Sequence, residues 1–204
     1  MNHIFWEGKK IAPSKIVCIG RNYVEHIEEL GNVVPDELVV FNKANSSIGE
    51  SLLSCHHEPL HFETELCFLV QHGEFVAAGV GLDLTKRQLQ SKLKKQGLPW
   101  ERAKAFDGSA VFAEFKSIDS DAVPTLSFSL TIDGRLQQSA NIERMMYKPQ
   151  VIKELVTEFM HLADNDIVMT GTPKGVAQVS AGSLYHVQLF ARQKLLTERS
   201  WRAI

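Results

Sequence analysis

The sequence is poor in cysteine, with only Cys18, Cys55 and Cys67 among its 204 residues. The number is odd and no Cys-x-x-Cys pair occurs, so the sequence predicts neither a disulfide framework nor a thiolate zinc site. Cys18 and Cys67 lie within apolar runs, where a cysteine usually behaves as a small buried side chain. We therefore expect reduced thiols and a cytoplasmic location.

The sequence also lacks long apolar runs and a large excess of charge. No segment approaches the roughly 20 apolar residues of a membrane-spanning helix, and residues 1–10 contain no apolar stretch of the length found in signal peptides. The formal net charge is -2 at pH 7, whereas nucleic acids and anionic membranes attract basic surfaces. These absences argue against a nucleic-acid partner and against a membrane partner.

No repeat, low-complexity tract or linker divides the chain, so residues 1–204 are expected to form one domain. The hydrophobic period switches between two and 3.6, which is typical of an α+β protein. The expected strands are Lys15–Gly20, Leu38–Asn42, His61–Val70, Phe75–Leu84, Leu126–Ile132, Arg135–Ser139, Ile167–Thr170 and Ser183–Leu189. The expected helices are Tyr23–Leu30, Thr85–Gln96 and Pro149–Leu162. Because the strands follow one another through short turns with few helices between them, we expect a β-rich core and no doubly wound parallel sheet.

Three acidic residues give the first indication of chemistry. Glu63 and Glu65 are two residues apart in an expected strand, so both side chains point to the same face and repel each other unless a cation or proton lies between them. Asp83 is a lone acid in an apolar run, and a hairpin would bring it beside the pair. Three carboxylates suit Mg²⁺, Mn²⁺ or Ca²⁺. The Glu-x-Glu spacing is common, however, and a solvated strand face with an unrelated acid nearby also explains it.

Five segments together resemble the fumarylacetoacetate hydrolase family, in particular its small single-domain branch of acylpyruvate hydrolases and oxaloacetate decarboxylases or tautomerases. The segments are Ile16–Tyr23 with Glu25 and His26, His61–Leu66, Gly81–Thr85 with Arg87, Gly97–Trp100 with Lys104 and Phe106–Asp107, and Thr170–Val176. The resemblance implies a mixed β-roll or barrel-like sandwich of the type found in the family's C-terminal domain, and a homodimer. It also implies that Glu63, Glu65 and Asp83 bind Mg²⁺, with Mn²⁺ as an alternative.

The expected helix after Tyr23 carries His26 and Glu29, which are three residues apart and therefore share a face. Taken alone, the two residues are equally explained as a surface pair. In hydrolytic members of the family, a His and a Glu at this spacing lie on a short lid helix and activate water. The resemblance therefore implies that His26 is a base and that Glu29 orients it.

Four further residues match positions of the family motifs. Lys104 matches a lysine that points at the substrate, where an ammonium would stabilise an enolate or oxyanion. Arg21 and Arg87 match arginines suited to carboxylate binding, and Thr172 in the Thr170–Gly175 loop is the expected substrate contact. Without the family, Lys104 is explained as an exposed lysine, and Arg87, one helical turn past Asp83, as a structural partner of that acid. Arg21 has the same two explanations, a substrate contact or a structural role.

One segment departs from the family pattern. Lys43-Ala44-Asn45-Ser46-Ser47 stands where many relatives have Lys-Pro-Ser after the second strand. We therefore expect a pocket wall that differs from those relatives.

The resemblance implies a metal-dependent hydrolase that cleaves a carbon–carbon bond in an acylpyruvate-type 2-oxo acid, such as fumarylpyruvate or acetylpyruvate. Oxaloacetate decarboxylation and keto–enol tautomerisation are alternatives on the same site, because all three reactions develop an enolate. The presence of His26 and Glu29 favours hydrolysis or decarboxylation over isomerisation alone. A catalytically silent metal-binding module is a further alternative, which the loss of a ligand, His26 or Lys104 would indicate, and none of these is missing.

Overall fold

A long hairpin forms the centre of the larger sheet. In the computed structural model, which describes residues 1–29, 31 and 34–204, the strands β5 (Leu60–Gln71) and β6 (Glu74–Lys86) pair antiparallel around a turn at His72 and Gly73. Both turn residues have positive φ angles, which a tight hairpin turn requires. The strand pair and the turn predicted from the sequence are therefore confirmed.

The hairpin belongs to an eight-stranded mixed sheet with the order β4-β3-β11-β5-β6-β7, in which β12 also pairs with β5 and β8 with β6. Its other strands are β3 (Lys15–Gly20), β4 (Val39–Ala44), β7 (Ala110–Phe112), β8 (Lys116–Ser117), β11 (Ile167–Met169) and β12 (Ala177–Gln178). Strands β3 and β11 run parallel, whereas β11 and β5 run antiparallel. Because parallel neighbours end at the same edge, the segments that follow β3 and β11 lie together.

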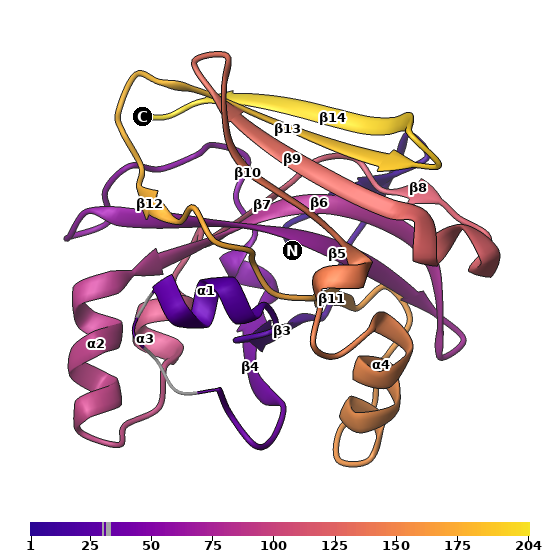
Figure 1. Ribbon diagram of the computed structural model, residues 1–204, viewed down its shortest axis with the longest axis horizontal. Helices are drawn as coiled ribbons and strands as arrows, with labels where there is room; N and C mark the ends of the chain where they lie inside the picture. The colour runs from indigo at the N-terminus through magenta and orange to yellow at the C-terminus, as the bar shows by residue number, and fades with distance from the viewer. Residues whose placement is uncertain (30, 32–33) are drawn as a thin grey trace.

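A four-stranded antiparallel sheet packs on one face of the larger sheet (Figure 1). Its order is β10-β9-β13-β14, built from β9 (Leu126–Ile132), β10 (Arg135–Asn141), β13 (Leu184–Ala191) and β14 (Lys194–Arg202). A separate two-stranded sheet pairs β1 (Ile4–Trp6) with β2 (Lys9–Ile11). The predicted β-rich sandwich is confirmed, and the sheets do not close into a barrel.

The helices lie on the opposite side of the larger sheet from the four-stranded sheet (Figure 1). They are α1 (Val24–Glu29), α2 (Arg87–Lys95), α3 (Glu101–Lys104) and α4 (Pro149–Thr157). Short 3₁₀ helices form elsewhere in the chain, at η1 (Asn45–Ser47), η2 (Ser120–Thr125) and η3 (Ile142–Arg144). In the part of the chain that the structure describes, none of the helices has both the length and the apolar character needed to span a bilayer.

The alternation of β5 and β6 decides which side chains enter the main core. Even-numbered residues such as Phe62 and Leu66 of β5 and Val80 and Leu82 of β6 pack against the smaller sheet. Odd-numbered residues therefore point to the helical side, because successive side chains of a strand alternate between faces. Glu63, Glu65 and Asp83 are all odd-numbered.

The three helices expected from the sequence all have boundaries that differ from the expectation. The helix expected from Thr85 begins at Arg87, because β6 continues through Lys86. The helix expected to reach Leu162 ends at Thr157, and the exposed Phe159 shows that the apolar period no longer faces the core there. The helix expected over Tyr23–Leu30 spans Val24–Glu29, and its expected end at Leu30 lies outside the described residues.

Candidate active site

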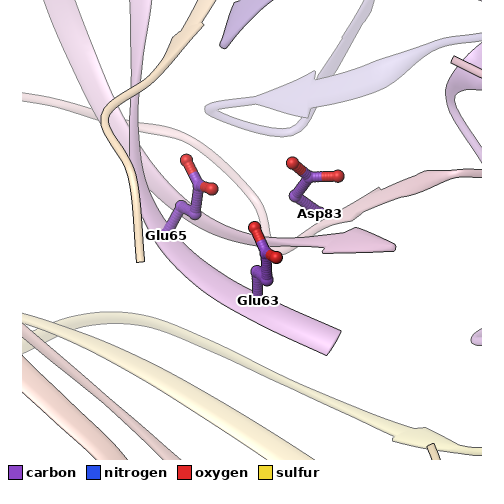
Figure 2. A group of neighbouring side chains, drawn as sticks. All are labelled: Glu63, Glu65 and Asp83. Atoms are coloured by element: carbon purple, nitrogen blue, oxygen red, sulfur yellow. The ribbon is translucent and has the colours of Figure 1, made fainter. Parts of the chain in front are cut away.

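The β5–β6 hairpin brings three carboxylates together on its helical face. Glu63 lies directly opposite Asp83 in the strand register, and Glu65 follows on the same face. One ligand oxygen from each of the three carboxylates lies within 4.8 Å of the others. Figure 2 shows the three side chains projecting toward one another from the two strands. The hairpin that the sequence predicted does bring Asp83 beside the glutamates.

The three carboxylates are buried, and their charges interact strongly. Burial, together with the charges of Asp83 and Glu63, raises the pKa of Glu65 well above its usual range, although Glu65 accepts a 2.7 Å hydrogen bond from the Gly171 amide. Burial also opposes ionisation of Glu63, but Lys104 and Arg87 hold its pKa well below the usual range. The cluster therefore retains negative charge that a cation would stabilise.

Lys104 lies at the end of α3 and reaches across to the carboxylates. Its Nζ donates hydrogen bonds to Glu63 Oε2 at 2.8 Å and Asp83 Oδ2 at 2.7 Å, and to Thr85 Oγ1 at 2.6 Å. Burial alone would lower the pKa of Lys104, but Asp83 and Glu63 raise it. Lys104 is therefore an ammonium inside the site, and the interpretation of an exposed surface lysine is wrong.

A second lysine, Lys43 of β4, lies behind Asp83 and was not predicted as a site residue. Its Nζ is 2.8 Å from Asp83 Oδ1 and also donates to the Lys104 carbonyl and to Ser109. The short contact with Asp83 lacks hydrogen-bond geometry, since Oδ1 has no hydrogen-bond partner among the described residues. That oxygen therefore keeps a lone pair for another cation.

The donor set fits a hard divalent cation. Glu63, Glu65 and Asp83 offer only oxygen atoms, which Mg²⁺ and Mn²⁺ prefer. The buried Asp83 Oδ1 without a hydrogen-bond donor is the kind of atom that a metal ion satisfies. The three residues can therefore hold a metal.

Helix α1 places His26 in the pocket beside Glu63 and Glu65. The Nδ1 atom of His26 lies 3.4 Å from Glu29 Oε2, and burial lowers the pKa of His26 although Glu63 and Glu29 oppose the shift. Glu29 also accepts hydrogen bonds from the Gly175 amide at 3.0 and 3.1 Å. The predicted pair thus forms, and it joins α1 to the loop after β11.

One face of α2 lines the same pocket through Arg87, Gln90 and Lys94, which are separated by three and four residues. Arg87 forms an ion pair with Glu63, and its Nη1 donates a 2.8 Å hydrogen bond to Gln90 Oε1. Arg87 therefore has a carboxylate partner in Glu63, although the sequence suggested Asp83 in that role. Neither Gln90 nor Lys94 was predicted, yet their helical spacing from Arg87 was a usable signal.

The remaining wall comes from the ends of the parallel strands β3 and β11. Arg21 follows β3 and Thr172 follows β11, and both line the pocket. The Asn22 side chain connects the two segments by donating a 2.8 Å hydrogen bond to the Thr170 carbonyl. Thr172 Oγ1 accepts a 3.0 Å hydrogen bond from Gln138 of β10, a residue that no local sequence pattern singled out.

The comparisons with known proteins agree with this fold. The protein-family model described as "Fumarylacetoacetate (FAA) hydrolase C-terminal" matches residues 15–196. The oxaloacetate tautomerase YcgM of Escherichia coli (strain K12) is 34% identical over 200 residues, covering 88% of this chain and 91% of that protein.

Two solved structures share the whole fold. A structure from Oleispira antarctica has a TM-score of 0.93 and 29% identity, and each chain is covered completely. Fumarylpyruvate hydrolase from Pseudomonas aeruginosa, solved with Mn²⁺ and pyruvate, has a TM-score of 0.87 and 26% identity, covering 100% of this chain and 95% of that one. Together with the match over residues 15–196, they place this chain in the fumarylacetoacetate hydrolase family.

Proposed function

We propose that the protein is a divalent-metal-dependent tautomerase that interconverts the keto and enol forms of oxaloacetate. The observation that carries the proposal is the arrangement of a buried His26 beside Lys104 and the carboxylates Glu63 and Glu65 in one pocket. This arrangement supplies a proton carrier and a cation next to a metal centre. The activity named for the relative from Escherichia coli supports oxaloacetate as the substrate.

Glu63, Glu65 and Asp83 would hold the metal, which we propose to be Mg²⁺ with Mn²⁺ as a substitute. Their oxygen ligands suit both ions, and the fumarylpyruvate hydrolase structure contains Mn²⁺. When bound, such an ion polarises a substrate carbonyl as a Lewis acid. Arg21 and Thr172, at the ends of β3 and β11, would contact the substrate from the opposite wall.

The chain's own groups then move one proton. His26, kept neutral near pH 7 by its burial, takes a proton from the carbon next to the carbonyl. The electron pair of the broken C–H bond forms a C=C bond, and the carbonyl oxygen gains the negative charge and then accepts the proton from the His26 imidazolium. Lys104 stabilises that charge as an ammonium, while Glu29 fixes the orientation of the His26 ring.

Hydrolysis of an acylpyruvate is the second candidate, and the His26–Glu29 contact favours it because this pair could activate water. The sequence alone favoured this reaction, and the fumarylpyruvate hydrolase structure supports it. Decarboxylation of oxaloacetate needs the same metal centre and Lys104 but no water. We place tautomerisation first because the similarity to the oxaloacetate tautomerase is higher, at 34% against 26% identity.

A panel assay on the purified protein with Mg²⁺ distinguishes these reactions. We expect rapid loss of the enol absorbance of oxaloacetate without release of pyruvate, and EDTA should abolish it. Pyruvate released from acetylpyruvate or fumarylpyruvate would establish a hydrolase, and pyruvate released from oxaloacetate would establish a decarboxylase. Metal binding without turnover of any of these substrates would overturn the enzymatic proposal in favour of a binding module.

A further inference from the structure

Lys94 occupies the boundary between the inner pocket and its mouth. Its side chain lines the inner pocket with Glu63 and Lys104, and it also lines the outer pocket with Arg21 and Trp100. The Nζ atom of Lys94 lies 4.8 Å from the centroid of the Trp100 ring, a distance at which a cation is attracted to an aromatic face. The ammonium is therefore held in a defined position.

The charges around Lys94 differ from those around the inner cations. Lys104 and Arg87 each contact a carboxylate of the β5–β6 hairpin. In residues 1–29, 31 and 34–204, no carboxylate lies within ion-pair distance of Lys94. Burial lowers the pKa of Lys94 to about 8, with the charges of Arg21 and Arg87 adding to the effect. A half-buried cation among other cations is costly unless an anion joins it.

The two ends of the pocket thus carry side chains of opposite charge. The inner end holds the carboxylates that would bind a metal, whereas the outer end presents Lys94 and Arg21. If a 2-oxo acid directs its oxo group and adjacent carboxylate toward the metal, its other end would lie toward Lys94, which lines the same pocket. A methyl group there would leave the ammonium without a partner, whereas a second carboxylate would pair with it.

We propose that Lys94 is a specificity-determining residue that binds the distal carboxylate of a 2-oxo dicarboxylate and so selects it over a 2-oxo monocarboxylate. The proposal rests on the proposed function, because the metal centre must bind the other end of the substrate. Trp100 holds the Lys94 side chain in place, and Arg21 adds positive charge at the same end of the pocket.

The test compares oxaloacetate with 2-oxobutanoate, which has the same carbon chain but a methyl group in place of the distal carboxylate. Enol–keto conversion of oxaloacetate and hydrogen–deuterium exchange at C3 of 2-oxobutanoate would be measured for wild type, Lys94→Met, Lys94→Arg and Lys95→Met. Lys95→Met is the matched control, because this substitution removes the same charge one residue away. Lys95 lines only the outer pocket.

We expect Lys94→Met to raise KM for oxaloacetate by roughly 10- to 100-fold, the effect of losing a hydrogen bond to a charged group. For Lys94→Met, the kcat for oxaloacetate and the kcat/KM for 2-oxobutanoate should stay within about twofold of the wild-type values. A change of that size is too small to signify a lost interaction. Lys94→Arg should restore most of the affinity, and Lys95→Met should resemble wild type. Equal losses for both substrates, or equal effects of the Lys94 and Lys95 variants, would overturn the proposal.

Binding measured separately from turnover tells this proposal apart from the proposed function. The shift in Tm that each 2-oxo acid causes in the presence of Mg²⁺ would be recorded for the same variants. If oxaloacetate binds through Lys94 but is not converted, the carboxylate subsite stands and the tautomerase assignment fails. If wild type converts oxaloacetate and Lys94→Met binds it equally well, the tautomerase stands and the subsite fails. If oxaloacetate neither binds nor reacts, both are overturned.

Discussion

Lys43 and Asp83 form a buried ion pair, with 2.8 Å between Nζ and Oδ1 and both side chains wholly inaccessible to solvent. Lys43 also donates hydrogen bonds to the carbonyl groups of Lys104 and Ser109. It therefore connects the carboxylate to the backbone that carries Lys104. Its role is to position these groups, since it does not line the pocket.

Replacement of Lys43 by Met should destabilise the protein and weaken metal binding. Asp83 would keep only Lys104 as a cationic partner, so we expect a loss that approaches the about 3–5 kcal/mol that breaking a buried ion pair costs in the free energy of unfolding. Urea denaturation measures this loss, and a Mn²⁺ titration measures the affinity. Lys116→Met is the control, because Lys116 pairs with Glu7 and Glu114 at the surface and should cost less than about 1 kcal/mol. Equal losses in the two variants would contradict the positioning role.

Glu65→Gln should separate metal affinity from fold stability. The Gln side chain keeps an oxygen for the Gly171 amide but removes a carboxyl group whose ionised form is opposed by burial and by the charges of Asp83 and Glu63. We expect unchanged or higher stability without metal, and a loss of metal affinity above the roughly 10- to 100-fold that outer-shell partners alone cause. Calorimetric titration with Mg²⁺ and thermal unfolding give the two values. Glu74→Gln, at the exposed end of the same hairpin, should retain full affinity, and undiminished binding by Glu65→Gln would refute the ligand assignment.

The activity should depend on pH through His26. Burial lowers the pKa of His26 below the ordinary 6.5, so the neutral base is present at pH 7 and becomes protonated only as the pH falls through that lowered pKa. We therefore expect kcat/KM to be constant near neutral pH and to decline on the acid side, with the midpoint below 6.5. In His26→Gln the rate should fall by roughly 100- to 10,000-fold and this acid limb should disappear. A midpoint above 6.5, or an unchanged profile in the variant, would exclude His26 as the base.

Gly171→Ala should disturb the site more than an equivalent change elsewhere. Gly171 has a φ of +95°, and a Cβ atom there would lie 2.9 Å from Asn22 Cβ and 3.1 Å from the Ile19 carbonyl oxygen. Gly182 also has a positive φ, but a Cβ atom there would meet nothing within 4 Å. Gly182→Ala should cost about 1–2 kcal/mol of unfolding free energy for the left-handed backbone. Gly171→Ala should cost about 1–3 kcal/mol more and should also weaken metal binding through Glu65. Similar losses of stability in both variants would show that the space around Gly171 is not limiting.

Local sequence patterns predicted the parts of the site that lie within one element. The period of two placed Glu63 and Glu65 on one face, and the apolar run around Asp83 marked an acid that needed a partner. The helical spacing of His26 and Glu29 predicted their contact. In each case the chemistry follows from side-chain direction within a strand or helix, which the sequence encodes directly.

The rest depended on how distant segments pack. Lys43 lies 61 positions from the Lys104 carbonyl that it contacts, and Gln138 lies 34 positions from Thr172. Neither pairing leaves a local signal, and the strand expected from the sequence ended at Asn42, one residue before Lys43. Strand β14 was not predicted either, because its residues mix charged and apolar types without a clear period and it is defined by its pairing with β13.

The β5–β6 hairpin carries all three candidate metal ligands, and a two-residue turn joins its strands. The acidic cluster can therefore assemble as soon as these two strands pair, whereas the candidate base His26, the ammonium of Lys104 and the side chain of Lys94 arrive on α1, α3 and α2. Mutation can consequently alter the helices around the pocket without dismantling the candidate metal centre.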